Sequence, residues 1–287
     1  MFGGAYGYEK SCYSFSTLSQ KWTKLPDLPS ARHQHGSAII GNSVFLVGGW
    51  GNNAVEKYNT VTEKFTKVNV VKKSAFPAAE SRISFGMCVY RTDSLLIASG
   101  CPNNKSEITK SCFLLDTKAQ TAREVGSLNE GRGGHALVNF EEEVFCIGGS
   151  SINYMGVATY FSSIEKFNPV TEEWMTSHLK LIEGRRDHQA VTYKQFIYVL
   201  GGRTEKGYTD TIERINVSEG KVEMLDVKLR RWCSVFAVAV VKSDLYIFGS
   251  HGGGGSTEVL NLETLEIKEG VEPPESSHRF TACSLWY

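Results

Sequence analysis

Short hydrophobic runs alternate with polar segments along the whole chain, and six of these runs end in two small residues. They read MFGG, VFLVGG, LLIASG, VFCIGG, IYVLGG and LYIFGS, and the first small residue of each is Gly3, Gly48, Ser99, Gly148, Gly201 and Gly249. Such runs are typical of buried β-strands. The intervals between them are 45, 51, 49, 53 and 48 residues. A period near fifty predicts a repeat architecture of the propeller type.

A second marker, two bulky residues seven positions apart, follows each small pair. Turn-forming residues lie between them, as in Tyr58-Asn59-Thr60-Val61-Thr62, so each marker predicts a β-hairpin. The third copy is degenerate, because it pairs Leu115 with Ala122 and its small pair reads SG rather than GG. The six pairs are Phe15 and Trp22, Tyr58 and Phe65, Leu115 and Ala122, Phe167 and Trp174, Ile215 and Val222, and Leu260 and Ile267.

A third marker precedes the small pairs from the second onward and starts with arginine, as in Arg32-His33-Gln34-His35-Gly36. Related stretches start at Arg82, Arg132, Arg185-Arg186 and Arg230-Arg231. Each unit therefore holds four strands, a to d: strand a follows the arginine, b ends at the small pair, and c and d form the hairpin. Such units bury their faces by stacking around an axis. The predicted fold is all-β, a six-bladed β-propeller of four-stranded antiparallel blades.

These three markers together resemble the kelch repeat, and the resemblance covers essentially the whole chain. FLVGGW…VEKYNTVTEKF and YVLGGR…IERINVSEGKV are good matches. Kelch propellers are mostly recognition modules, and in that family the d–a and b–c loops line one face of the ring. The resemblance therefore implies a protein-protein interaction module that binds a peptide or protein partner. In many relatives this domain selects substrates for a ubiquitin ligase, whereas other kelch proteins bind actin.

The ends of the chain read as two halves of one blade. Residues 1–4 resemble a clipped strand b, and residues 278–287 resemble a strand a. We expect them to pair and close the ring, which would remove exposed sheet edges. One domain is expected over 1–287, without BTB or BACK domains. Its repeats are approximately 1–30 plus 277–287, 31–76, 77–129, 130–181, 182–229 and 230–276.

Composition narrows the class of partner. The chain has 31 basic and 31 acidic residues, and a zero net charge argues against nucleic acid as a partner. The longest apolar run, Val235 to Val241, is too short to span a bilayer, so no membrane partner is expected. Seven cysteines without a C-x-x-C pattern indicate thiols in a reducing compartment. We expect a cytoplasmic, monomeric propeller.

The candidate partner-binding residues follow from the resemblance. Those in the d–a loops are Arg32, Arg82, Arg132, Arg186 and Arg231, and those in the b–c loops are Tyr6, Trp50, Arg203 and His251. A ring of guanidinium groups favours carboxylate-rich, acidic peptides through bidentate hydrogen bonds. In the alternative interpretation each arginine holds a loop by bonding neighbouring carbonyls or an acidic residue, and Trp50 and its counterparts pack against the next blade.

Catalysis is not expected. His35, His135 and His188 recur in R-x-x-H, but equivalent positions on different blades lie too far apart to share a metal ion. The run from His251 to Ser256 lacks the Lys-Ser/Thr of a phosphate-binding loop. No cofactor is therefore predicted. A small-molecule enzyme of the kelch propeller type stays as the alternative of a different class.

Overall fold

The computed structural model describes residues 1–4, 10–50, 52, 54–72, 82–102, 107–152, 157–249, 257–275 and 281–284. These residues form an all-β structure with four-stranded antiparallel sheets that recur along the chain. Each such sheet has its strands in the spatial order a, b, c, d, which is also the order in the sequence.

Five sheets contain all four strands of the repeat. The sheet of β3 (Gly36–Ile40), β4 (Ser43–Val47), β5 (Val55–Asn59) and β6 (Lys64–Val68) comes first. The others are β9 (Gly86–Tyr90), β10 (Ser94–Ala98), β12 (Cys112–Asp116) and β13 (Thr121–Val125); β14 (Ala136–Phe140), β15 (Glu143–Ile147), β18 (Ser163–Phe167) and β19 (Trp174–Lys180); β21 (Gln189–Tyr193), β22 (Phe196–Leu200), β25 (Thr211–Asn216) and β26 (Lys221–Lys228); and β27 (Ala237–Val241), β28 (Asp244–Phe248), β29 (Thr257–Asn261) and β30 (Ile267–Glu269).

Shorter strands complete the set. The hairpin of β1 (Cys12–Ser16) and β2 (Lys21–Leu25) stands alone as a two-stranded sheet, and β7 (Val71–Lys72) runs parallel to β13. Small sheets in the loops join β8 (Arg82–Ile83) with β11 (Cys101–Pro102), β16 (Ser150–Ile152) with β17 (Ala158–Tyr160), and β20 (Arg185–Arg186) with β23 (Arg203–Thr204) and β24 (Gly207–Tyr208).

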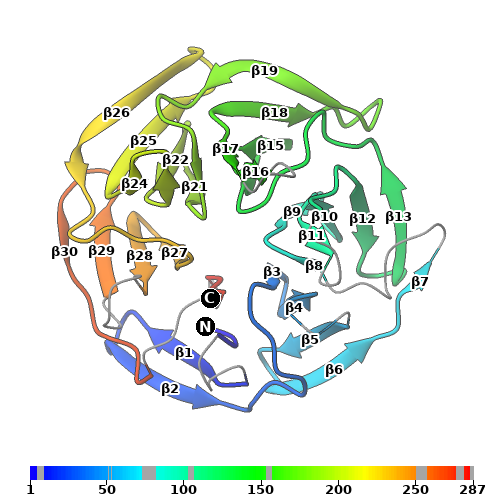
Figure 1. The fold of residues 1–287 in the computed structure, drawn as a ribbon. Helices are drawn as coiled ribbons and strands as arrows, with labels where there is room; N and C mark the ends of the chain where they lie inside the picture. Colours follow the sequence, from blue (N-terminus) through cyan, green and yellow to red (C-terminus); the bar gives the residue numbers. More distant parts are fainter. Residues whose placement is uncertain are drawn as a thin grey trace.

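The sheets stand around a central axis, with strand a innermost and strand d at the rim (Figure 1). The innermost strands β3, β9, β14, β21 and β27 contact one another in series. Burial follows this arrangement: in all five strands b the first residue is half-buried and the next four are buried. Strands d are far more exposed. The core therefore lies between neighbouring sheets.

All six hydrophobic pairs predicted from the sequence are confirmed as direct cross-strand partners in the c–d hairpins. Tyr58 and Phe65 have ring centroids 4.8 Å apart, and those of Phe167 and Trp174 are 5.1 Å apart. An asparagine closes several of the turns: the Oδ1 of Asn59 accepts the amide N–H groups of Val61 and Thr62, at 3.0 and 2.8 Å. Such turns hold strands c and d in register.

In the Gly-Gly pairs the second glycine is needed, because strand b ends there against the d–a loop. Gly149 has a φ of +94°, and a Cβ there would lie 2.8 Å from the Cβ of His135. Gly202 has a φ of +92° and the same separation from His188. Only glycine adopts this backbone without strain and also allows the close approach.

The two ends of the described chain meet at Phe2. This residue forms an antiparallel bridge with Cys12 of β1 and another with Thr281. The Phe2 amide donates to the carbonyl oxygen of Thr281 at 3.0 Å, and the Thr281 amide donates back at 3.4 Å. Phe2 therefore bridges the segment at Thr281 to the two-stranded sheet of β1 and β2, although these residues are far apart in the sequence.

Candidate loop face

The d–a and b–c loops share one face of the molecule, because antiparallel strands a, b, c and d place these connections at the same end of each sheet. The small sheets of β8 and β11 and of β20, β23 and β24 tie a d–a loop to the b–c loop of the same unit. We call the surface made by these loops the loop face. The c–d hairpin turns lie at the opposite end.

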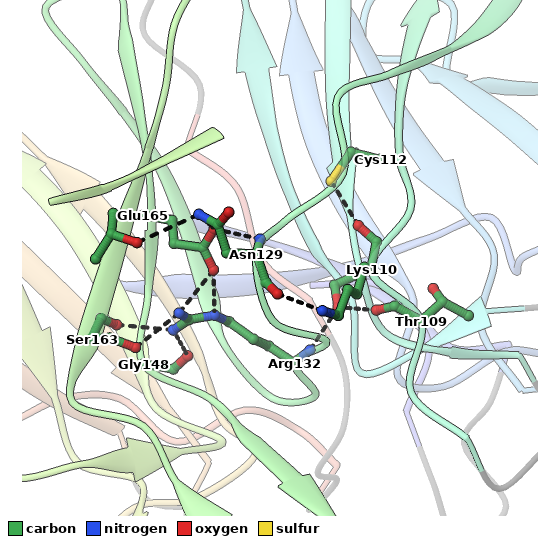
Figure 2. Close-up of polar contacts among 10 residues, drawn as sticks. Thr109, Lys110, Cys112, Asn129, Arg132, Gly148, Ser163 and Glu165 are labelled. Carbon is green, nitrogen blue, oxygen red and sulfur yellow. Dashed lines mark hydrogen bonds and ion pairs between the residues drawn. The ribbon is translucent and has the colours of Figure 1, made fainter. Parts of the chain in front are cut away.

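Arg132 shows what the arginine of the repeat does. Its guanidinium group is buried and pairs with the Glu165 carboxylate, with Nη2 2.9 Å from Oε1. It also donates to the carbonyl oxygens of Gly148 and Ser163, each at 2.9 Å (Figure 2). The second oxygen of Glu165 accepts the backbone N–H of Asn129 at 2.7 Å. One ion pair thus holds the d–a loop, the first glycine of the pair and strand c together.

The same arrangement recurs in two other sheets. Arg32 pairs with Glu56 at 2.8 Å and donates to the Gly48 carbonyl at 3.1 Å. Arg185 pairs with Glu213 at 2.7 Å and donates to the Gly201 carbonyl at 2.9 Å. Both ion pairs are buried.

Arg82 is also buried, but the residue at its equivalent glutamate position is Phe113. Its guanidinium donates to the Ser99 carbonyl at 2.6 Å, and its Cζ lies 5.1 Å from the Phe113 ring centroid.

These positions correct the expectation that guanidinium groups form a ring around the mouth. Arg32, Arg82 and Arg132 point into the structure, where a ligand on the surface does not reach them, and the geometry matches the alternative in which arginines hold loops. In the unit that follows that of Arg132, Arg185 occupies the buried arginine position. Arg186 is therefore one residue out of register and is partly exposed.

In the last complete sheet the equivalent position is Cys233, and Arg231 lies in the loop before it, exposed. Glu258 is kept at the glutamate position and is 3% exposed. Its Oε2 accepts the backbone N–H of Arg230 at 2.9 Å, as Glu165 accepts that of Asn129. Its Oε1, at the side where an arginine would lie, has no hydrogen-bond partner among the described residues. Burial raises the pKa of this carboxyl group.

The three histidines of the R-x-x-H motif are buried. Burial, together with the nearby charge of Arg132 or Arg185, lowers the pKa values of His135 and His188 to about 3. His35 is shifted well below its usual pKa for the same reasons, and its Nε2 lies 3.0 Å from the Thr281 hydroxyl. These side chains fill the space between strand a and the glycine pairs.

Other candidate residues are accessible on the loop face. Trp50 is 54% exposed and stacks on His33 with ring centroids 6.0 Å apart. Tyr208 and Trp232 stack at 4.5 Å, and they join the b–c loop of one unit to the d–a loop of the next. Arg203 lies over the Tyr208 ring at 5.4 Å.

Arg186 lies over the ring of Tyr160 at 5.8 Å, again between neighbouring units. Aromatic and cationic side chains thus meet where the loops of two units adjoin.

Two candidates, Tyr6 and His251, lie outside the described residues. The pairing of Trp232 with Tyr208 was missed by the sequence reasoning, since nothing in the spacing relates these loops.

Three further observations concern the cysteines, possible metal ligands and membrane-spanning helices. None of the seven cysteines, all of which lie in the described residues, forms a disulfide bond. Burial raises the pKa values of the Cys112 and Cys233 thiols to about 12, which makes them poor nucleophiles. Among the described residues, no group of three or more His, Cys, Asp or Glu is arranged to hold a metal ion. The same part of the chain contains no helix long and apolar enough to cross a membrane.

Comparisons with known proteins agree with this architecture. The Kelch motif family model matches residues 31–69 and 131–176. The chain is 26% identical over 238 residues to Kelch-like protein terF of Aspergillus terreus, which covers 75% of this chain and 50% of the relative. It is 22% identical over 298 residues to Kelch-like protein 36 of Mus musculus, covering 96% and 46%. It is 25% identical over 213 residues to human Kelch domain-containing protein 3, covering 66% and 54%.

The chain spans about half the length of the curated relatives it matches. The repeat of four-stranded sheets and these matches together support the assignment of kelch repeats in this chain.

Proposed function

We propose that the loop face binds a peptide or protein partner. One observation carries this proposal: within the described part of the chain, the exposed large aromatic side chains, Trp50, Tyr208 and Trp232, all belong to d–a or b–c loops. Exposed tryptophan and tyrosine side chains supply most of the binding free energy at many protein interfaces. The c–d turns at the opposite end carry isolated aliphatic residues such as Val61 and Val170, which are ordinary surface residues.

The proposed partner segment is acidic. Arg186, Arg203 and Arg231 are the candidate arginines that keep accessible surface on the loop face. Arg203 and Arg186 both lie over aromatic rings. This position leaves the guanidinium edge of Arg203 available to bond a carboxylate, whereas the Nε of Arg186 already lies 3.3 Å from the Asp187 carboxylate. The partner would therefore combine carboxylates with apolar side chains that pack on the aromatic groups.

The proposal includes a closed ring of six blades in one domain. The five complete sheets would be joined by a sixth blade, made from β1, β2, residues 1–2 and the segment at Thr281. The bridges of Phe2 to Cys12 and to Thr281 support this closure. A closed ring would hold the loops in fixed positions and so lower the entropy lost when a partner binds.

The test uses an acidic peptide selected from a display library against the whole chain. We expect the double variant Tyr208→Ala/Trp232→Ala to bind it at least tenfold more weakly, and Arg203→Ala to weaken binding mainly at low salt. The matched control is Val61→Ala/Val170→Ala on the opposite face, which should bind like the wild type. Equal affinity of all three variants would overturn the proposal.

Substrate selection for a ubiquitin ligase and association with actin are two forms of this proposal, both implied by the kelch resemblance. The two forms differ in the partner that the loop face would bind. Both would place the protein in the cytoplasm. Cosedimentation with actin filaments, with and without the Tyr208→Ala/Trp232→Ala substitutions, separates them. A filament interaction that depends on these aromatic residues would favour actin binding.

A further inference from the structure

The unit of Cys233 keeps the backbone of the buried arginine site although a cysteine stands at the arginine position. The carbonyl oxygen of Cys233 accepts the amide N–H of Gly202 at 2.6 Å, and the carbonyl oxygen of Arg185 accepts that of Gly149 at 2.8 Å. Two residues after Cys233 the backbone has a φ of +57°, close to the +54° found two residues after Arg185. Position 233 therefore has the backbone that turns an arginine side chain inward in the neighbouring unit.

The glutamate of the site is also kept in place. Glu258 is the cross-strand partner of Ile247, as Glu165 is of Cys146. Both glutamates are buried, and each accepts a backbone N–H of the preceding d–a loop through Oε2. The Glu258 carboxyl group is thus held as Glu165 is held where it meets Arg132 (Figure 2). We call the place beside Glu258 Oε1 the Glu258 site.

The side chain at position 233 supplies no cation to the Glu258 site. The Cys233 thiol lies 3.5 Å from the carbonyl oxygen of Arg231, within its own loop. Cysteine is also much smaller than arginine. In the part of the chain that the structure describes, Glu258 Oε1 has no hydrogen-bond partner, and the residue is only 3% exposed. A buried carboxylate oxygen without a partner is costly, so this atom marks a place for a donor.

The other units show which donor suits this place. In each of them an arginine Nη1 donates to the carbonyl oxygen of the first small residue after strand b, at distances between 2.6 and 3.1 Å: Gly48, Ser99, Gly148 and Gly201. Gly249 is the corresponding residue in the unit of Cys233. A planar guanidinium group has several N–H donors and can bond a carboxylate and a carbonyl oxygen at once.

The two arginines of this d–a loop lie outside the Glu258 site. The guanidinium of Arg230 pairs with Glu269 at 2.8 Å, and it is the backbone N–H of Arg230 that meets Glu258. Arg231 is exposed. A guanidinium group in the Glu258 site would therefore come from another molecule.

We propose that the Glu258 site binds a guanidinium group, held between Glu258 Oε1 and the carbonyl oxygen of Gly249. This group can come from a small guanidinium compound in solution or from an arginine side chain of a bound protein. The ligand would tie the d–a loop to strand c, as Arg132 does in its own unit. Because Trp232 is next to Cys233, the ligand would also restrain the loop that carries this exposed aromatic residue.

The probe is methylguanidinium chloride at low millimolar concentration, far below the concentrations that unfold proteins. We expect it to raise the Tm of the whole chain by a few degrees at saturation, whereas methylurea, a neutral molecule of similar shape, and sodium chloride at the same ionic strength should not. Glu258→Gln should abolish the rise because the charge is lost, and Cys233→Arg because the new side chain fills the site. Cys233→Ser is the matched control and should keep the rise.

A pair of peptides separates the two sources of the guanidinium group. One is an acidic peptide that binds the loop face and also contains an arginine, and the other has citrulline, which is neutral, at the same position. If a partner arginine enters the Glu258 site, the arginine peptide should bind the wild type at least fivefold more tightly, and Cys233→Arg should remove the difference. Equal binding of both peptides would assign the site to small guanidinium compounds.

Two results would overturn the proposal: no rise in Tm of the wild type with methylguanidinium, or the same rise in the Glu258→Gln variant. The binding of acidic peptides at the loop face is tested through Tyr208, Trp232 and Arg203, none of which supplies a group to the Glu258 site. The two proposals can therefore fail independently.

Discussion

Glu258 faces Cys233 at a place where three other sheets pair a glutamate with an arginine. Its Oε2 keeps the backbone hydrogen bond that Glu165 and Glu213 make, but within the part of the chain that the structure describes its Oε1 has no hydrogen-bond partner. The carboxyl group is thus held in position for a guanidinium that the sequence does not supply. This departure from the repeat leads to two predictions about stability.

Cys233→Arg should stabilise the protein. The new guanidinium would pair with Glu258 and with a neighbouring carbonyl, and it would satisfy a buried acceptor, which is worth on the order of 1 kcal/mol or more. Urea unfolding would measure the change in the free energy of unfolding. In the double variant Cys233→Arg/Glu258→Gln the gain should disappear, and a gain that persists there would contradict this explanation.

Glu258 should also make stability fall as pH rises. Burial raises the pKa of the folded carboxyl above its usual value of 4.5. At pH values between the usual pKa of the unfolded chain and the raised pKa of the folded chain, Glu258 has lost its proton in the unfolded chain and keeps it in the folded chain. A rise in pH therefore favours unfolding. Glu258→Gln should flatten the profile of unfolding free energy against pH above pH 4.5. A profile unchanged by this substitution would mean that Glu258 titrates normally.

Glu165→Gln should be strongly destabilising. It leaves the buried guanidinium of Arg132 without its counter-charge, and breaking a buried pair on one side costs about 3–5 kcal/mol. The matched control is Glu269→Gln, which breaks the exposed pair with Arg230 and should cost less than about 1 kcal/mol. Urea midpoints of the two variants give the comparison, and similar losses for both would contradict the structural role of the buried pair.

The buried histidines should make the protein sensitive to acid. His135 and His188 have folded pKa values of about 3, against 6.5 in an unfolded chain. As pH falls below 6.5 the unfolded chain binds protons that the folded chain does not, so stability falls by about 1.4 kcal/mol per pH unit for each histidine. His188→Gln should reduce this slope between pH 6 and pH 4, as measured by urea unfolding at each pH.

The sequence predicted the hairpins well because their markers are local. Phe167 and Trp174 are seven residues apart, and the turn residues between them fix the register. The ion pairs of the buried arginines were harder to predict from the sequence, because Arg132 and Glu165 are 33 residues apart and a loop of variable length lies between them. A signal did exist: Glu56, Glu165, Glu213 and Glu258 each precede the first bulky residue of the hairpin by two positions.

The choice between Arg185 and Arg186 could have been made from the sequence, because the R-x-x-H motif that ends at His188 starts at Arg185. The structure decides it through the backbone: Gln34, Gly134 and Asp187 all have a positive φ two residues after the buried arginine. This kink sets which side chain turns inward. Accessibility on the loop face likewise depends on how loops of neighbouring sheets meet, as Tyr208 and Trp232 do, and the spacing of the repeats does not encode that contact.

The most direct test of the loop face is amide hydrogen exchange of the whole chain, alone and with a bound acidic peptide. We expect slower exchange at residues 201–210 and 229–235, which hold Tyr208, Trp232 and their neighbours, and no change at the hairpin turns 60–63 and 168–172. Slower exchange at those turns, with the loops unaffected, would contradict the account.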